Sequence, residues 1–248
     1  MASLLFRLEG PMQSWGTQSR FTMRETGLEP SKSGVIGLLC AALGKPREES
    51  EADAARWPSL ESLASLGFAV RVDRPGRVER DYHTAGGSHH KGERYGVIRA
   101  DGRSSTPVVS NRYYLADASF LAGLDGDLSL LECLAAALKS PVWPIYLGRK
   151  SFVPSCPAFL DDGLTERSLA EALTDYPWTA RNRGEAIRAR RDGLKLTVVA
   201  DATLFPEAGG GGGDIRHDVP LSFAERRFGT RAVVTRTVDI SPERIRGD

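Results

Sequence analysis

A lysine between two serines stands directly before an apolar helical pattern. Ser31, Lys32, Ser33 and Gly34 precede Val35, and the first N–H groups of a helix have no partners within the helix. Such N–H groups and a lysine ammonium both attract a phosphate oxygen. The glycine that precedes the lysine in a P-loop is missing, which excludes a nucleotide-hydrolysing loop. Two interpretations stay open: a phosphate contact, or a capped helix with a solvated lysine.

A second set of residues has the types needed for acid–base chemistry on RNA. Tyr82, His83 and Lys91 lie in a segment rich in Gly, His and Arg. A metal-independent ribonuclease uses such groups to deprotonate a 2′-hydroxyl group and to stabilise the developing charge. The composition permits this chemistry without requiring it.

The metal-ligating residue types form no metal motif. His89 and His90 are adjacent on a glycine-rich stretch, which lacks the spacing and rigidity of a metal site. The three cysteines lie far apart without a CxxC pair, at Cys40, Cys133 and Cys156. An odd and sparse set argues against disulfides and structural zinc. We therefore expect no metal, no cofactor and a reducing compartment.

The chain is nearly neutral overall but basic in two stretches. Its 248 residues include 33 Lys and Arg against 32 Asp and Glu, and 41% hydrophobic residues, which are typical of a globular protein. Any nucleic-acid surface must therefore be local. Cations outnumber carboxylates in residues 74–112 and again in residues 181–195. The second stretch is interpreted either as a contact with a nucleic-acid backbone or as a solvated surface.

The elements that position these residues alternate between strand and helix. Apolar patterns predict strands at 4–8, 68–72, 108–115, 119–124 and 143–147, and helices ending at Leu43 and spanning 128–139. Strands at 78–82 and 94–100 are expected to pair as a hairpin with a polar tip. The order is that of a ferredoxin-like (RRM-like) βαββαβ fold of the α+β class, which leaves one sheet face free for RNA.

The predicted organisation has two parts. Residues 1–148 are expected to form a palm with an inserted thumb hairpin at about 74–112, and residues 149–248 a smaller β-rich domain with a glycine-rich loop at 209–213. A helix is predicted at 165–173 and strands at 194–200 and 231–240. The longest apolar run, 35–43, is too short for a membrane span of about 20 residues. The N-terminus lacks the apolar core of a signal peptide, so we expect a cytoplasmic protein.

Three stretches carry long and specific patterns. They are LEGPMQSWG at 8–16, PSKSGVIGLLCAALG at 30–44 and YLGRKS at 146–151. In this order they closely resemble the CasD family, the subunits of the type I-E CRISPR surveillance complex Cascade that belong to the repeat-associated mysterious protein superfamily. The resemblance extends to about Pro157, and the last third of the chain matches only loosely.

The resemblance implies a fold and a function. The fold is a ferredoxin-like palm with a β-hairpin thumb inserted before its third strand and a smaller C-terminal domain. Such subunits cap the 5′ handle of the guide RNA (crRNA) without cutting it. They contact the backbone subunit and the large PAM-reading subunit of the complex, and they reach target DNA indirectly through it.

The resemblance and the basic stretches together predict an RNA-binding surface and no catalytic residues. The expected RNA contacts come from the motifs, the segment between the first two motifs, the thumb and the basic pair after the last palm strand: Gln13, Ser14, Trp15, Arg24, Lys32, Ser33, Gly34, His89, Arg94, Arg112, Arg149 and Lys150. For Trp15 a place in the core is an equal alternative.

Two other functions stay open. A related subtype uses its homologue as a metal-independent endoribonuclease that processes repeat RNA, but here Tyr82, His83 and Lys91 fall on the thumb rather than on the palm. A third hypothesis is binding of duplex DNA through the two basic stretches.

Overall fold

The computed structural model describes residues 2–16, 19–20, 22–50, 53–86, 96–98, 102, 107–205 and 213–247. Within them the strands are β1 (Ala2–Gln13), β2 (Ser19–Arg20), β3 (Met23–Arg24), β4 (Gly67–Arg74), β5 (Arg77–Ala85), β6 (Val108–Gly126), β7 (Phe159–Thr165), β8 (Trp178–Thr179), β9 (Leu194–Asp201), β10 (Asp214–Ser222), β11 (Arg227–Ile240) and β12 (Ile245–Arg246). The α-helices are α1 (Lys32–Leu43), α2 (Leu60–Ser65), α3 (Leu128–Lys139), α4 (Leu169–Asp175) and α5 (Arg183–Asp192).

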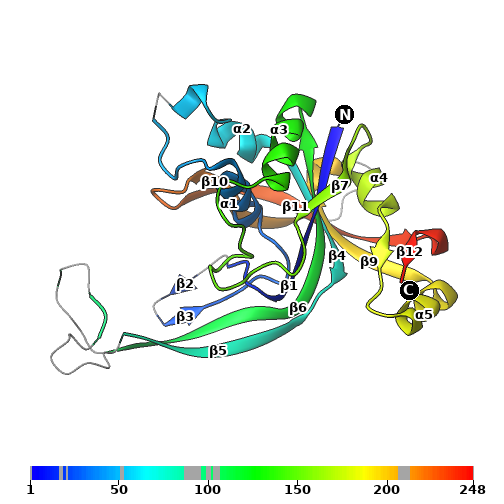
Figure 1. The fold of residues 1–248 in the computed structure, drawn as a ribbon, viewed down its shortest axis with the longest axis horizontal. Helices are drawn as coiled ribbons and strands as arrows, with labels where there is room; N and C mark the ends of the chain where they lie inside the picture. Colours follow the sequence, from blue (N-terminus) through cyan, green and yellow to red (C-terminus); the bar gives the residue numbers. More distant parts are fainter. Residues whose placement is uncertain are drawn as a thin grey trace.

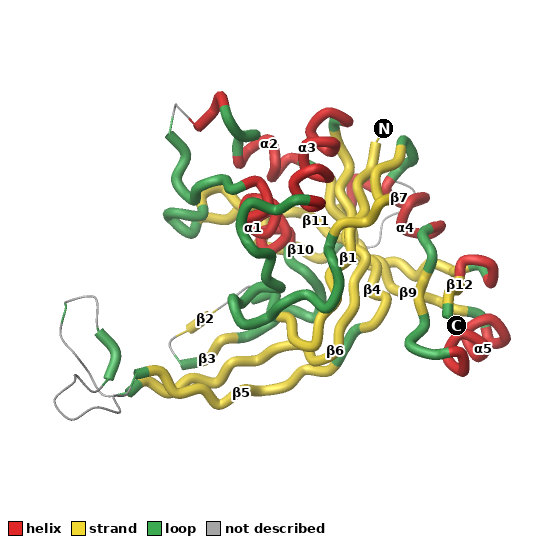
Figure 2. The backbone as a smooth tube through the Cα atoms, in the orientation of Figure 1, coloured by secondary structure: helices red, strands yellow, loops and turns green. Residues whose placement is uncertain are grey.

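The molecule is a mixed α/β protein built on one large, mostly antiparallel sheet. The main path of this sheet runs β10-β11-β9-β4-β6-β1-β7, and every neighbouring pair along it is antiparallel. Helix α1 connects β1 to β4, and α3 connects β6 to β7. The strands of the predicted C-terminal part, β9 to β11, extend this same sheet (Figures 1 and 2).

Alternation along β1 separates the two faces of the sheet. Leu4, Phe6 and Leu8 face α1 and α3 and belong to the larger core, which also contains Ile36 and Leu134. Successive strand residues point to opposite faces. Leu5 accordingly lies in the second core with Leu169 and Leu173 of α4. Helices therefore cover both sheet faces, although α4 covers only part of its face (Figure 1).

A long hairpin leaves the sheet beside β1. Strand β5 pairs with the first half of β6, from Arg77 opposite Ala116 to Ala85 opposite Val108. Figure 1 shows this hairpin extending away from the helices. The predicted pairing of 78–82 with 94–100 is wrong, because 108–126 is one continuous strand whose first half takes that place. Most of the predicted tip lies outside the described residues.

The predicted strand at 143–147 is also wrong. This segment is a loop in which Pro144 has no N–H to donate, and Leu147 reaches the core without belonging to a strand. Strand β7 lies at 159–165 instead and pairs with β1. The predicted helix at 165–173 starts later, because Ser168 and Glu171 form a capping box at the beginning of α4. No helix in the described part is long and apolar enough to cross a membrane.

Helix α1 starts and stops where the sequence predicts. Ser31 is the N-cap, and its Oγ accepts a hydrogen bond from the N–H of Gly34 at 3.2 Å. Gly44 ends the helix with φ +70°, a left-handed conformation that favours glycine.

Ser31→Ala should lower the free energy of unfolding by about 1 kcal/mol, because the Gly34 N–H loses its acceptor. Ser33→Ala is the matched control, since its side chain does not cap the helix, and it should leave stability nearly unchanged. Urea denaturation followed by circular dichroism measures both variants. Equal losses would show that the cap contributes nothing.

Candidate nucleic-acid interface

The three motif segments meet at Trp15. The Trp15 side chain is 1% exposed. A Cβ on Gly34 would lie 3.0 Å from its ring, so the start of α1 packs directly on the indole. The N–H of Ser14 donates to the Leu147 carbonyl at 3.0 Å, which joins the first motif to the third. The motifs thus form one connected scaffold.

Gln13 and Trp15 have their polar atoms engaged inside this scaffold. The Gln13 amide donates to the carbonyls of Leu8 and Ala118 at 3.1 and 2.8 Å. Its Oε1 accepts from the Trp15 Nε1 at 3.0 Å. Ser14 is also buried, and its hydroxyl points to the Tyr113 carbonyl at 3.4 Å. The structure gives these three side chains positioning roles, and direct RNA contact by them stays a prediction.

Three arginines predicted to bind RNA come together where the hairpin leaves the sheet. Strand β3 pairs in parallel with β6, which places Arg24 opposite Arg112. Arg149 follows Gly148 and donates to the Arg24 carbonyl at 3.4 Å. We call Arg24, Arg112 and Arg149 the arginine cluster. Asp81, opposite Arg112 on β5, is a nearby carboxylate.

The electrostatics of the arginine cluster favour an anion. Partial burial, followed by the charges of Arg112 and Arg24, lowers the pKa of Arg149, and Asp81 offsets this only in part. Like charges held close together repel unless a counter-charge joins them. A phosphate group supplies that charge and accepts hydrogen bonds from a guanidinium. The cluster is therefore suited to a nucleic-acid backbone.

A tight turn holds Arg149 in place. The Phe152 N–H donates to the Arg149 carbonyl at 2.9 Å, and the Leu147 N–H donates to the Phe152 carbonyl at 2.8 Å. The Arg149 guanidinium donates to the Tyr113 carbonyl at 2.8 Å and lies 5.3 Å from the centre of the Phe152 ring. Its orientation is therefore set before any ligand binds.

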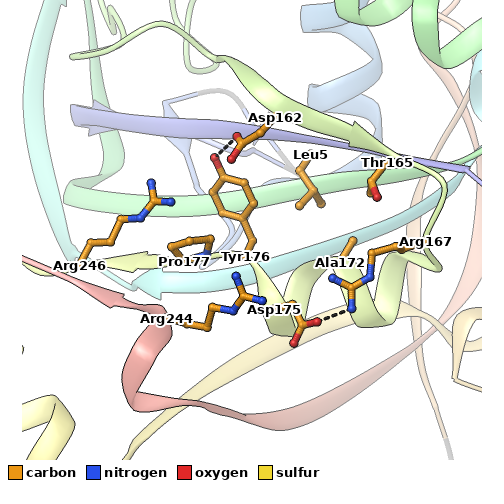
Figure 3. Close-up of a pocket in the computed structure, with 10 residues that line it drawn as sticks. All are labelled: Leu5, Asp162, Thr165, Arg167, Ala172, Asp175, Tyr176, Pro177, Arg244 and Arg246. Carbon is orange, nitrogen blue, oxygen red and sulfur yellow. Dashed lines mark hydrogen bonds and ion pairs between the residues drawn. The ribbon is translucent and has the colours of Figure 1, made fainter.

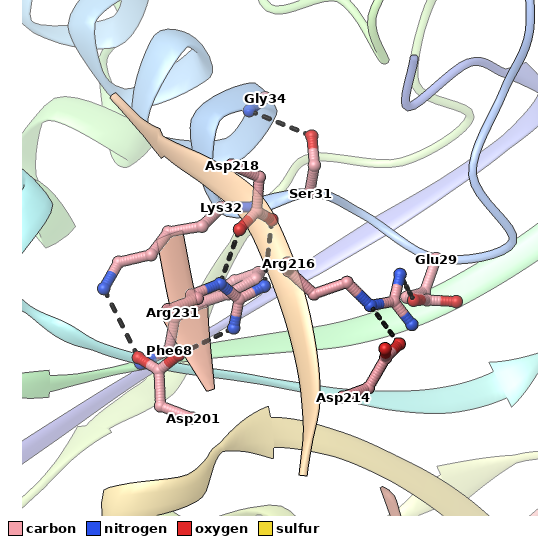
Figure 4. A network of polar contacts seen from close by, with 10 residues as sticks. All are labelled: Glu29, Ser31, Lys32, Gly34, Phe68, Asp201, Asp214, Arg216, Asp218 and Arg231. Atoms are coloured by element: carbon pink, nitrogen blue, oxygen red, sulfur yellow. Dashed lines mark hydrogen bonds and ion pairs between the residues drawn. The ribbon is translucent and has the colours of Figure 1, made fainter. Parts of the chain in front are cut away.

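Lys32 is not a surface residue. Its side chain is 6% exposed, and its Nζ lies 3.3 Å from an Asp201 oxygen. Asp201 and Asp218 both pair with Arg231, at 2.7 and 2.6 Å (Figure 4). The interpretation of a solvated lysine is therefore wrong, whereas the capped helix is confirmed. We call Lys32, Asp201, Asp218 and Arg231 the buried ion network.

The start of α1 already holds an anion from its own chain. The N–H of Lys32 donates to the Asp218 carboxylate at 2.8 Å. Burial raises the pKa of Asp218, but hydrogen bonds from Arg231 and its charge outweigh this, so the net shift is downward. Burial lowers the pKa of Lys32, and Asp201 opposes the shift. In this conformation the Lys32 ammonium and the Lys32 N–H are both committed to internal carboxylates.

The remaining predicted residues are dispersed. Ser33 is half-buried in α1, and Lys150 is exposed beside Arg149. His89, Arg94 and Lys91 lie outside the described residues. Tyr82 and His83 are neighbours on β5 and so point to opposite faces of the hairpin, with His83 3.4 Å from Asp81. This places the two ribonuclease candidates apart rather than around one site.

A pocket of about 160 Å³ lies beside α4 and contains several arginines (Figure 3). Arg167, Arg244 and Arg246 line it together with Asp162 and Asp175. Arg167 pairs with Asp175. The Tyr176 hydroxyl donates to Asp162 at 2.8 Å, and burial followed by this bond raises the pKa of Tyr176 to about 12. Asp175 neutralises Arg167, and Asp162 adds a further negative charge, so the pocket is less suited to nucleic acid than the arginine cluster.

The fold and the cluster together define a mixed α/β protein with a basic surface at the base of a projecting hairpin. The chain belongs to the Cas5 family of CRISPR-associated proteins, because the sequence profile described as CRISPR-associated protein (Cas_Cas5) matches residues 3–234. A curated relative, the CRISPR system Cascade subunit CasD of Escherichia coli (strain K12), is 37% identical over 170 residues, which are 63% of this chain and 69% of the relative. The resemblance to the CasD family is confirmed.

Two solved structures are similar over nearly the whole chain. One, described as a crystal structure of a Cas protein, has 38% sequence identity and a TM-score of 0.67, and the match covers 99% of this chain and 98% of the other. A chain of a CRISPR RNA-guided surveillance complex has 31% identity and a TM-score of 0.73, covering 99% and 93%. The similarity therefore includes the last third of the chain, where the sequence patterns match only loosely.

Proposed function

We propose that this chain is a non-catalytic, RNA-binding subunit of a type I-E Cascade that caps the 5′ handle of the crRNA. The observation that carries the proposal is the arginine cluster. Arg24, Arg112 and Arg149 come from three separate segments and meet at one surface, where Arg24 is exposed and the other two are partly buried. Membership of the Cas5 family and the similarity to a chain of an RNA-guided surveillance complex support guide RNA as the ligand.

The strand order supports a ferredoxin-like palm as the scaffold for this site. Strands β7, β1, β6 and β4 lie side by side and antiparallel, and α1 and α3 make the two crossovers. This is the order of a split βαβ fold. The β5–β6 hairpin is the thumb of the proposed palm. Its base lies at the arginine cluster, so RNA bound there would also contact the thumb.

In the proposed assembly the chain bridges the Cascade backbone subunit and the large PAM-reading subunit. It reaches target DNA through the complex and works in the cytoplasm. The relative from Escherichia coli is named as a Cascade subunit, which supports this assignment.

The endoribonuclease stays as the second candidate, and the geometry disfavours it. Tyr82 and His83 point to opposite faces of β5, and a general acid and base must both reach the reacting ribose. Incubation with repeat RNA in the absence of metal ions distinguishes the two functions. Retention of intact handle RNA supports the cap, and cleavage supports the enzyme.

The combined variant Arg112→Gln, Arg149→Gln should weaken binding of a labelled 5′-handle RNA by about a hundredfold at low salt. Each lost charge-assisted contact is expected to cost roughly tenfold. The slope of log affinity against log salt should fall by about 1.4, since each phosphate contact on a single strand contributes about 0.7. Fluorescence anisotropy at several salt concentrations measures both quantities.

The matched control is Arg47→Gln with Arg227→Gln, which removes the same charge from exposed positions away from the cluster. It should change affinity less than twofold. Arg149→Lys keeps the charge and should retain most of the salt dependence. If the double variant and the control bind handle RNA equally well, the arginine cluster is not the RNA site.

A further inference from the structure

The second basic stretch of the sequence forms α5, and the proposed RNA site leaves it unused. The side of α5 that faces the protein is made of small residues: Ala186 is buried, and a Cβ on Gly247 would lie 2.8 Å from its Cβ. The Arg190 guanidinium donates to the Ile245 carbonyl, which ties the helix to β12. The other arginines of α5 are exposed to solvent: Arg183, Arg188 and Arg191. We call these three the α5 arginines.

The carboxylates near the α5 arginines are already engaged. Asp192 accepts from Arg191 at 2.7 and 3.0 Å, and this bond, more than the charge of Arg188, lowers the pKa of Asp192. Glu185 accepts from the backbone N–H of Arg181. In the described part of the chain, neither Arg183 nor Arg188 forms a salt bridge. Glu185 keeps its negative charge, because its donor is a neutral N–H, so the three α5 arginines exceed Glu185 and Asp192 by one positive charge.

Flanking groups do not cancel this charge. The other two cations of the stretch, Arg181 and Lys195, pair with Asp117 at 2.9 Å and with Asp239 at 3.2 Å. Arg244 and Arg246, on the segment next to α5, are exposed and add positive potential. Glu243 lies beside them with a lowered pKa, mainly because of its hydrogen bond from Ser241, and it offsets one of these two charges, so one positive charge remains.

The side chains on this face favour double-helical DNA over single strands and over double-helical RNA. Proteins that hold single strands stack bases on exposed aromatic rings. The exposed face of α5 offers no such ring, because Trp178 beside it is only 6% exposed and the large apolar side chain exposed on α5 is Ile187. An α-helix fits the major groove of B-form DNA, whereas that of A-form RNA is narrow. From Arg183 to Arg191 the helix rises roughly 12 Å, at about 1.5 Å per residue.

We infer that α5 binds the phosphate backbone of double-helical DNA through Arg183 and Arg188, the two α5 arginines that form no salt bridge in the described part of the chain. The contact is electrostatic and independent of sequence. In Figure 1, α5 lies to the right of the sheet and strand β3, which carries Arg24, lies to the left, so this surface is separate from the arginine cluster. The inference goes beyond the proposed function and does not depend on it.

The test compares the full-length chain with Arg183→Gln, Arg188→Gln, using a labelled 30-base-pair DNA duplex of arbitrary sequence. Loss of two phosphate contacts should lower the slope of log affinity against log salt by about 1.8 and weaken binding at low salt by at least tenfold. Changing the sequence of the duplex should change neither value. Binding of 5′-handle RNA should be unaffected, so failure of this inference can be told apart from failure of the RNA site.

Controls decide whether α5 itself is responsible. Arg183→Lys, Arg188→Lys keeps the charge and should keep most of the salt slope. Arg47→Gln with Arg227→Gln removes equal charge elsewhere and should leave duplex binding within twofold. The inference is overturned if this control weakens duplex binding as much as the α5 variant. It is also overturned if the parent protein binds a single strand or an RNA duplex more tightly than the DNA duplex.

Discussion

Asp218→Asn is expected to lower the free energy of unfolding by about 3–5 kcal/mol, the usual cost of breaking a buried ion pair. Asp218 faces both Arg231 and the N–H of Lys32, and its side chain is 5% exposed. Without its charge, two buried cations share the single carboxylate of Asp201. The amide oxygen can still accept a hydrogen bond, so the loss reports charge rather than shape. Urea denaturation followed by circular dichroism measures it.

Asp214→Asn on the same strand is the matched control. Asp214 pairs with Arg216, but its side chain is 73% exposed, so the change should be within about 0.5 kcal/mol. The pH dependence gives a second check. The pKa of Asp218 is lowered in the folded state, so its stabilisation is present above the unfolded pKa of about 3.9 and is lost as pH falls through the folded value. The difference between parent and variant should therefore shrink below about pH 4. A difference that persists at lower pH would contradict the assignment.

The buried ion network also explains why the local sequence predicts a solvated lysine at position 32, where the structure has a buried one. A lysine at a helix start is normally solvated, and nothing near residue 32 indicates otherwise. Its partners are the carboxylates of Asp201 on β9 and Asp218 on β10, and both of these also pair with Arg231 on β11. Only the packing of these strands against the start of α1 brings the four side chains together. Asp201, Asp218 and Arg231 were accordingly absent from the predicted site, and no short motif contains them.

Local patterns were sufficient where an element is set by its own residues. Ser31 and Gly44 delimit α1, and the apolar run 68–72 lies within β4. Local patterns gave wrong strands where the pairing of distant segments determines which residues join the sheet. The sequence 94–100 predicts a strand, but β5 pairs with residues 108–116 instead. Residues 143–147 are as apolar as a strand, yet Pro144 and the contact with Ser14 make them a loop, of which only Leu147 is buried.

The arginine cluster could be predicted only in part: its residues from the sequence, but not their arrangement. The resemblance to the family and the basic composition point to Arg24, Arg112 and Arg149 separately. Their convergence depends on the parallel pairing of β3 with β6 and on the turn after Leu147. Neither feature is visible in a hydrophobic pattern. For Gln13 and Trp15 the sequence motif is specific, but the side chains it identifies are buried. Their hydrogen bond supports the segments that carry the surface residues.

Gly148 is the point at which this scaffold and the arginine cluster join. Its φ is +97°, a backbone conformation that residues with a side chain rarely adopt. A Cβ there would lie 1.9 Å from the carbonyl oxygen of Ser14. That oxygen belongs to backbone held by the Ser14 N–H bond to Leu147, so it has little room to move. Relief of the clash must displace the chain that carries Arg149.

Gly148→Ala should therefore lower stability by more than the roughly 1–3 kcal/mol that an unfavourable backbone conformation alone costs, and it should also weaken handle-RNA binding. Gly193→Ala is the matched control, because Gly193 has φ +77° but nothing within 4 Å of an added Cβ. It should show the backbone cost without the clash and leave RNA affinity within twofold. Urea denaturation and fluorescence anisotropy measure the two properties side by side. Equal stability losses in the two variants would mean that the Ser14 carbonyl yields easily, and unchanged RNA affinity in Gly148→Ala would mean that the turn does not position Arg149 for binding.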